Sequence, residues 1–249
     1  MTSAVGPIEA VSLSSAQFAA LGRLAGAEAL LDGWLPEISV PAWFAVVDGL
    51  AARGLLASAD GGATYRATAA SRPLIDPVAE ADRAWSALAE TDDGVLGRLV
   101  LGAERSLVGF DLASEDGPVL APIAQEVVPA FLLDVLGLED AGTDPTAAVE
   151  HQVGFDAFVA ALAGEHSAGL DQPTLAHLTD FARALSAATS QVRFERRLQT
   201  PVGVVVDHCS WFDGGDLGCW RMHPSGDTVS FAQCTRGQLR SVVLDLLDG

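Results

Sequence analysis

The C-terminal part of the chain restricts the fold most, because apolar runs and turn residues alternate there with little else between them. Strand-forming runs separated by glycine-containing turns are typical of an antiparallel meander. The last segment, 235–248, instead spaces its apolar residues three and four apart, which predicts a closing helix. The predicted strands are 201–212, 217–222 and 228–234, with turns at 213–216 (DGGD) and 223–227 (HPSGD).

An earlier stretch repeats this order of strands, turns and a closing helix. The turn SEDG at 114–117 lies 110 residues before PSGD at 224–227, and LDVL at 133–136 lies 111 residues before LDLL at 244–247. Two such modules can pair their strands into one sheet. The earlier strands are expected at 97–101, 106–113 and 117–123.

These repeats predict one domain over 1–249 with two quasi-symmetric halves, at about 1–138 and 151–249, joined by the loop 139–148. Apolar spacing predicts further helices, each packing one face on a core. In the segment 77–90 this interpretation makes Trp85 a core residue. The helices are expected from Ser15, at 41–56, at 77–90, from Gly154 and from Pro173.

The helix at 41–52 is followed by a glycine-rich turn and the short strand TYRAT, an order that also occurs in winged-helix proteins. A regulatory or DNA-binding protein is therefore the alternative interpretation, with a methyltransferase-like helper domain as a variant. The helix carries Asp48 and no basic residue, so it has little with which to read bases.

The number and distribution of charged residues exclude further classes of function. The formal net charge is −19, and from Ser106 to Ala182 there are 13 acidic residues and no basic one. Such a surface repels phosphate backbones, so it indicates either a solvated face or a partner with a basic or amide-rich surface. All 14 basic residues are arginine, which excludes P-loop, Schiff-base and Ser-x-x-Lys chemistry.

The remaining features favour a soluble cytoplasmic protein. The N-terminus has no basic segment followed by an apolar one, and no apolar run reaches membrane length without a charge. Three cysteines, an odd number, suit a reducing compartment. We therefore expect no membrane association and no nucleic-acid partner, while a homo-oligomer stays open.

The best candidate for a metal site is His208-Cys209 with Cys219 and His223, in and beside the stretch CSWFDGGDLGCW. With Gly214 and Gly215 as a two-residue turn, Cys209 would face Trp220 and Ser210 would face Cys219, so the two cysteines would lie on opposite faces of the hairpin. No other metal or catalytic motif occurs, and His177 lies off the apolar stripe of its helix. We expect no catalytic residue, no metal and no cofactor, although an enzyme of unrecognised type remains an alternative.

The strand ending in Ser210-Trp211-Phe212-Asp213, with the turn, strands and amphipathic helix that follow, resembles the EspG family. The GLAARGLL helix end and the early hairpin followed by an apolar helix agree with it. The resemblance implies an α+β fold, with a central, mainly antiparallel sheet flanked by helical bundles. It also implies a cytosolic chaperone of actinobacterial type VII (ESX) secretion, without catalysis, that binds helical secreted substrates such as a PE–PPE heterodimer or a WXG100-like protein.

The family's partner surface involves a loop of the central sheet and the C-terminal helical bundle. The corresponding candidates in this chain are the loop Gly102, Ala103, Glu104 and Arg105 and the helix carrying Leu175 and Leu178.

Overall fold

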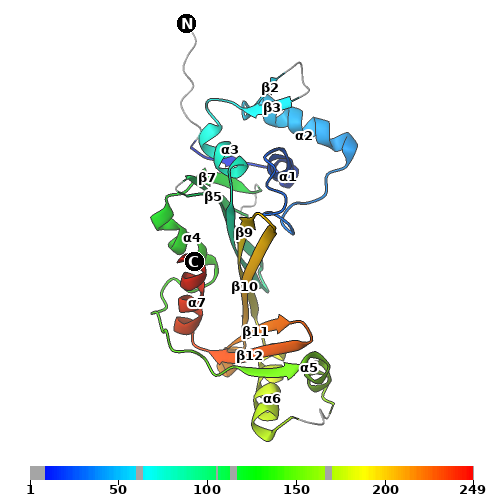
Figure 1. Ribbon diagram of the computed structural model, residues 1–249, viewed down its shortest axis with the longest axis vertical. Helices are drawn as coiled ribbons and strands as arrows, with labels where there is room; N and C mark the ends of the chain where they lie inside the picture. The colour runs from blue at the N-terminus through cyan, green and yellow to red at the C-terminus, as the bar shows by residue number, and fades with distance from the viewer. Residues whose placement is uncertain (1–8, 60–63, 105, 113–116, 166–169, 249) are drawn as a thin grey trace. The chain divides into compact units, whose positions relative to one another are not determined.

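The computed structural model describes residues 9–59, 64–104, 106–112, 117–165 and 170–248. Within these ranges the chain is α+β, as expected, with a large antiparallel sheet and helices between its strands (Figure 1). The ten strands of the main sheet follow the order β1-β7-β6-β5-β4-β9-β10-β11-β12-β8. None of the described helices is long and apolar enough to cross a membrane.

The strand order confirms the quasi-symmetry. Each half of the chain supplies one edge strand, then helices, then a four-stranded meander and a closing helix. The first half contains β1 (Val11–Ser12), α1 (Ser15–Leu24), α2 (Val40–Ala52), β2 (Leu56–Ala59), β3 (Thr64–Ala67), α3 (Arg72–Ala79), β4 (Arg83–Thr91), β5 (Gly94–Ala103), β6 (Ser106–Asp111), β7 (Val119–Pro122), η2 (Gln125–Val127) and α4 (Val128–Val135). The second contains β8 (His151–Gly154), α5 (Phe155–Leu162), α6 (Gln172–Ser186), β9 (Ser190–Thr200), β10 (Gly203–Asp213), η3 (Gly215–Leu217), β11 (Cys219–Ser225), β12 (Thr228–Cys234) and α7 (Arg236–Asp248).

Contacts between residues divide the chain into two compact units, and the boundaries of these units differ from those of the two halves. Unit 1 comprises 1–86, 97–131 and 196–206, and unit 2 comprises 87–96, 132–195 and 207–249. The long strands β4, β5, β9 and β10 contribute to both units. The boundaries of the repeat at 1–138 and 151–249 remain a prediction.

Unit 1 packs α1, α2 and α3 around a mainly aliphatic core. Helix α1 begins at a capping box, in which the Ser14 hydroxyl accepts from the Gln17 amide and the Ser14 amide donates to the Gln17 side chain, both over 3.1 Å. Strands β2 and β3 form a separate two-stranded sheet after α2, of which only the strand TYRAT was predicted. The core includes Leu13, Phe18, Leu31, Leu50, Leu74 and Phe110.

Unit 2 has an aromatic core between the sheet and the helices α5 and α6. Strands β11, β12 and β8 pair successively in antiparallel register, and α5 packs on α6 and on β8. The predicted closing helix is confirmed as α7, which buries Leu239 and Val243. The core contains Val153, Phe158, Leu178, Phe181, Phe212, Trp220, Val229 and Phe231.

The predicted helix at 77–90 is wrong. The chain forms the short helix α3, which ends at Ala79, and then the strand β4 from Arg83. Alanine, leucine and glutamate favour a helix locally, but β4 lies inside the sheet and most of its residues are buried, so tertiary packing overrides propensity. Trp85 is buried, as expected, although on a strand.

Besides β4, which was predicted as a helix, the strands β2, β8 and β9 were absent from the expectations. Strand β9 carries several arginines, and its apolar residues Val192 and Phe194 alternate with polar ones, a period-two pattern that could have revealed it. The expected strand start at Ile8, the turn at 59–62 and most of the turn SEDG lie outside the described residues.

Candidate partner-binding site

The residues at the beginning of helix α6 determine where the helix starts. The Asp171 carboxylate accepts a hydrogen bond of 2.8 Å from the Thr174 amide, and Pro173 stands in the first turn, where its missing amide hydrogen costs nothing. The buried residues of the helix are Leu178, Phe181 and Ala184, spaced three apart. One face of α6 therefore points into the core, and the rest is left for other contacts.

Phe181 anchors this buried face in a cluster of aromatic rings. Its ring centroid lies 5.2 Å from that of Phe212, 5.3 Å from Phe231 and 5.7 Å from Trp220. The α5 residue Phe158 packs edge-on against it at 5.4 Å. Edge-on aromatic packing is directional, so this cluster sets the positions of both helices on the sheet.

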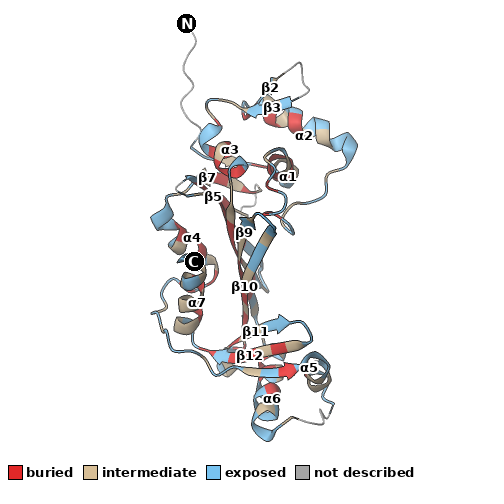
Figure 2. Ribbon diagram, in the orientation of Figure 1, coloured by how far each residue is buried: buried red, intermediate tan, exposed pale blue. Residues whose placement is uncertain are grey.

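A shallow apolar groove of about 840 Å³ lies between α5, α6 and η3. Exposed apolar residues continue beyond it along α5, where Phe155 and Val159 are half exposed (Figure 2). A continuous exposed apolar surface of this kind is typical of a protein-binding site. The groove is lined mainly by Ala161, Leu162, Leu175, Thr179, Ala182 and Leu217.

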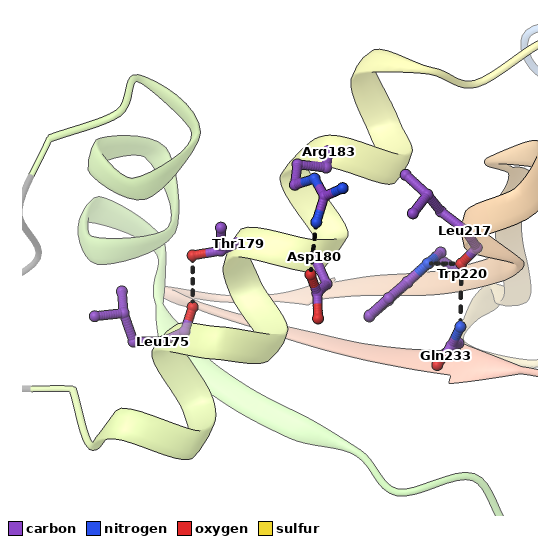
Figure 3. Close-up of polar contacts among 7 residues, drawn as sticks. All are labelled: Leu175, Thr179, Asp180, Arg183, Leu217, Trp220 and Gln233. Carbon is purple, nitrogen blue, oxygen red and sulfur yellow. Dashed lines mark hydrogen bonds and ion pairs between the residues drawn. The ribbon is translucent and has the colours of Figure 1, made fainter.

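Polar groups at the groove already have partners in the chain, as Figure 3 shows. The Thr179 hydroxyl donates to the Leu175 carbonyl over 2.8 Å. The Leu217 carbonyl accepts from the Trp220 indole over 2.9 Å and from the Gln233 amide over 3.0 Å, which holds the Leu217 backbone beside α6. The groove thus offers a partner chiefly apolar contact.

The charged residues around the groove are mainly acidic. Asp156, Glu165, Asp180 and Asp216 are exposed on α5, α6, η3 and the segment after α5. Arg183 lines the groove and forms an ion pair of 3.4 Å with Asp180, in which both side chains are more than half exposed. This arrangement suits binding of an apolar segment.

The candidate leucines of α6 have different positions. Leu175 lines the groove and is 38% exposed, whereas Leu178 is 0% exposed within the aromatic core. Because Leu178 presents no surface in this structure, it supports the site from beneath and does not offer a contact. Leu162, Ala182 and Leu217 were not among the candidates. The high apolar content of α5 could have indicated Leu162.

The other candidates form the tight turn between β5 and β6, in unit 1. Ala103 pairs with Ser106 across the turn, and Gly102 pairs with Leu107. Gly102 has φ +154°, and a Cβ there would lie 2.1 Å from the Ser106 carbonyl oxygen, so the turn requires glycine. Glu104 has φ 47°, and Arg105 lies outside the described residues.

The predicted register of the cysteine hairpin is wrong. The connection runs over Gly214–Gly218 through η3, so Asp213 pairs with Cys219 and Phe212 with Trp220. Cys219 then shares a sheet face with Arg221, which also interacts with Cys209, so the two cysteines lie on the same face. Within the described ranges the cysteines are free, and no group of three or more His, Cys, Asp or Glu could hold a metal.

Two histidines meet near the start of α6. His177 is exposed, as its place off the apolar stripe predicted, but its ring stacks on that of His151 with centroids 4.1 Å apart. Burial, and then the neighbouring His177, lowers the pKa of His151. The ring centroids of a second pair, His208 and His223, lie 5.0 Å apart. Burial lowers the pKa of His208. These surroundings favour the neutral imidazole of His151 and of His208.

Comparison by sequence gave no match, either to a family model or to a curated protein. The fold and the groove define an α+β protein with an extended antiparallel sheet and an apolar helical surface, and this fold does occur among solved structures. The chain matches the structure of the Mycobacterium tuberculosis type VII secretion system chaperone EspG5 in complex with a PE25-PPE41 dimer, with a TM-score of 0.57. The match covers 96% of this chain and 95% of that one, at 13% identity. The resemblance to the EspG family is therefore confirmed at the level of the fold.

Proposed function

We propose that this chain is a chaperone that binds a helical segment of a secreted protein and delivers it to a type VII secretion system. The observation that carries the proposal is the exposed apolar groove between α5 and α6, on a fold shared with a type VII secretion chaperone. An apolar groove between helices suits an amphipathic helix, which lays its apolar face into it.

The partner is a PE–PPE-like heterodimer or a WXG100-like helical protein, and the protein acts in the cytoplasm of an actinobacterium. Its role is binding, with no catalysis and no cofactor. The satisfied polar groups around the groove support this, since none of them is positioned to attack a substrate. The β5–β6 turn with Gly102, Ala103 and Glu104 provides a second contact.

The test is co-purification of the tagged chain with the helical secreted proteins encoded in its own genome. We expect one of them to be captured at 1:1 stoichiometry with the chain, and Leu175→Asp to abolish capture. Val202→Asp is the matched control, because Val202 is 96% exposed in the β9–β10 turn and is not among the residues that line the groove. Capture of no secreted protein, or equal loss in both variants, would contradict the proposal.

A further inference from the structure

The charges around the groove restrict what can bind in it. The sequence from Phe155 to Thr189 contains four acidic residues, Asp156, Glu165, Asp171 and Asp180, and the single arginine Arg183. Glu165 and Arg183 line the groove itself, and η3 adds Asp216. The rim, defined as Glu165, Asp180, Arg183 and Asp216, therefore has three carboxylates against one guanidinium, which is a net negative charge beside an apolar floor.

Arg183 does little to offset this charge. Its guanidinium lies 3.4 Å from the Asp180 carboxylate one turn earlier on α6, so the pair is locally neutral. An approaching partner accordingly meets the remaining carboxylates. At physiological salt the Debye length is about 8 Å, so charges placed directly on the rim act on a bound segment while more distant charges are screened.

The floor of the groove favours a helix as the occupant. Ala161, Gly164 and Ala182 are small and lie between the larger Leu162, Leu175 and Leu217. Small residues let a second backbone approach closely, and the leucines contact the sides of its apolar stripe. A second copy of this chain is a poor occupant, because each copy carries a formal charge of −19 and the two rims would repel.

We propose that the docking segment of the partner is an amphipathic helix whose apolar stripe is flanked by lysine or arginine. This inference rests on the proposed function and adds the chemistry of the partner. The apolar stripe fills the groove, and the flanking cations meet Glu165 and the neighbouring Asp216 of η3. The basic residues accelerate association and select against acidic helices, whereas the apolar contact limits dissociation.

The test uses the full chain and two synthetic 18-residue helices with the same leucine and alanine stripe. One carries lysine on both flanks and the other carries glutamate. Fluorescence anisotropy at 50 and 300 mM NaCl measures both affinities. We expect the lysine helix to bind about tenfold or more tightly at 50 mM, with the difference shrinking at 300 mM.

Two variants of equal charge change separate the rim from the overall charge of the chain. Glu165→Gln with Asp216→Asn removes the two rim carboxylates that lie outside the Arg183–Asp180 pair, so it should reduce the preference severalfold. Asp92→Asn with Asp93→Asn removes two exposed charges from the β4–β5 turn and should leave the preference unchanged. An equal loss in both variants overturns the inference, because the preference would then come from the total charge.

The outcomes also separate this inference from the proposed function. If both helices bind equally and Leu175→Asp abolishes both, the groove binds helices but the charge proposal fails. If a secreted protein is captured while neither helix binds, the charge proposal fails and the chaperone role stands. A dimer of this chain that Leu175→Asp disperses would identify a second copy as the occupant and overturn the inference.

Discussion

The two units bury their apolar residues in different ways. Unit 1 spreads its core over many leucines, valines and alanines, with Phe18 edge-on to Phe110 at 4.9 Å. Unit 2 concentrates its core in five aromatic rings, four of which surround Phe181. A core that depends on a few large rings positions its helices more strictly, and it loses more when one ring is removed.

The units also expose different apolar surfaces. In unit 1, Val40 and Phe44 lie exposed on the first turns of α2, and Phe44 is 66% exposed. In unit 2, the apolar residues of α5 and α6 border a groove with an acidic rim. The comparison indicates that a shaped surface, more than apolar exposure alone, marks the candidate site.

The largest effect is expected from removing the central ring of unit 2. Phe181→Ala should lower the free energy of unfolding by about 5 kcal/mol, since it leaves a cavity among four rings. The matched change Phe18→Ala in unit 1 should cost about 3 kcal/mol, because aliphatic neighbours can close in more easily. Urea unfolding followed by circular dichroism measures both. Equal losses would mean that the two cores respond alike.

The second largest effect is expected in partner binding, and it distinguishes the exposed apolar residues of unit 2 from those of unit 1. Leu175→Asp should weaken partner binding by about 2 kcal/mol or more, because it puts a charge into the apolar groove, while stability changes by less than about 0.5 kcal/mol. Phe44→Asp on α2 should leave binding intact. Isothermal titration with the captured secreted protein checks both variants. If only Phe44→Asp abolished binding, the partner-binding site would lie in unit 1.

Acidification should weaken unit 2 selectively, because all five histidines lie in its part of the sequence. His151 and His208 have folded-state pKa values below the ordinary value, so the unfolded chain binds protons more readily. Their contribution to stability is present above pH 6.5 and is lost as the pH falls below it. Hydrogen exchange at pH 7.5 and 5.5 should show lower protection in unit 2, after correction for intrinsic rates.

A double variant controls for this effect. His151→Gln with His208→Gln should remove most of the difference between the two pH values. If protection in unit 1 decreases to the same extent, the histidines are not the cause.

The smallest effect concerns thiol reactivity, which reports on unit 2 alone because all three cysteines lie there. Burial raises the pKa of the Cys209 thiol to about 11, so little thiolate exists at pH 8. The less buried Cys219 should therefore be alkylated first. Mass spectrometry of iodoacetamide-treated protein measures the order, and earlier labelling of Cys209 would contradict the packing described for β10.

The core of the candidate site was only partly predictable. The spacing of Leu175, Leu178 and Phe181 correctly indicated a helix with a buried stripe. It did not separate the exposed Leu175 from the buried Leu178, since both are leucines three residues apart and their exposure depends on how α6 is rotated on the sheet. The hairpin register failed for a similar reason, because a longer turn shifts every pairing.

The sequence by itself determined the α+β class, three strands of each meander, the closing helix α7 and the net negative charge. These follow from local periodicity, turn residues and charge counts, which depend on neighbouring residues alone. Only the tertiary structure decided that 83–91 is a strand, that Cys209 and Cys219 share a face, and that Leu162, Leu175 and Leu217 meet in one groove. Burial and register depend on segments far apart in the chain, and no local pattern records which of them will meet.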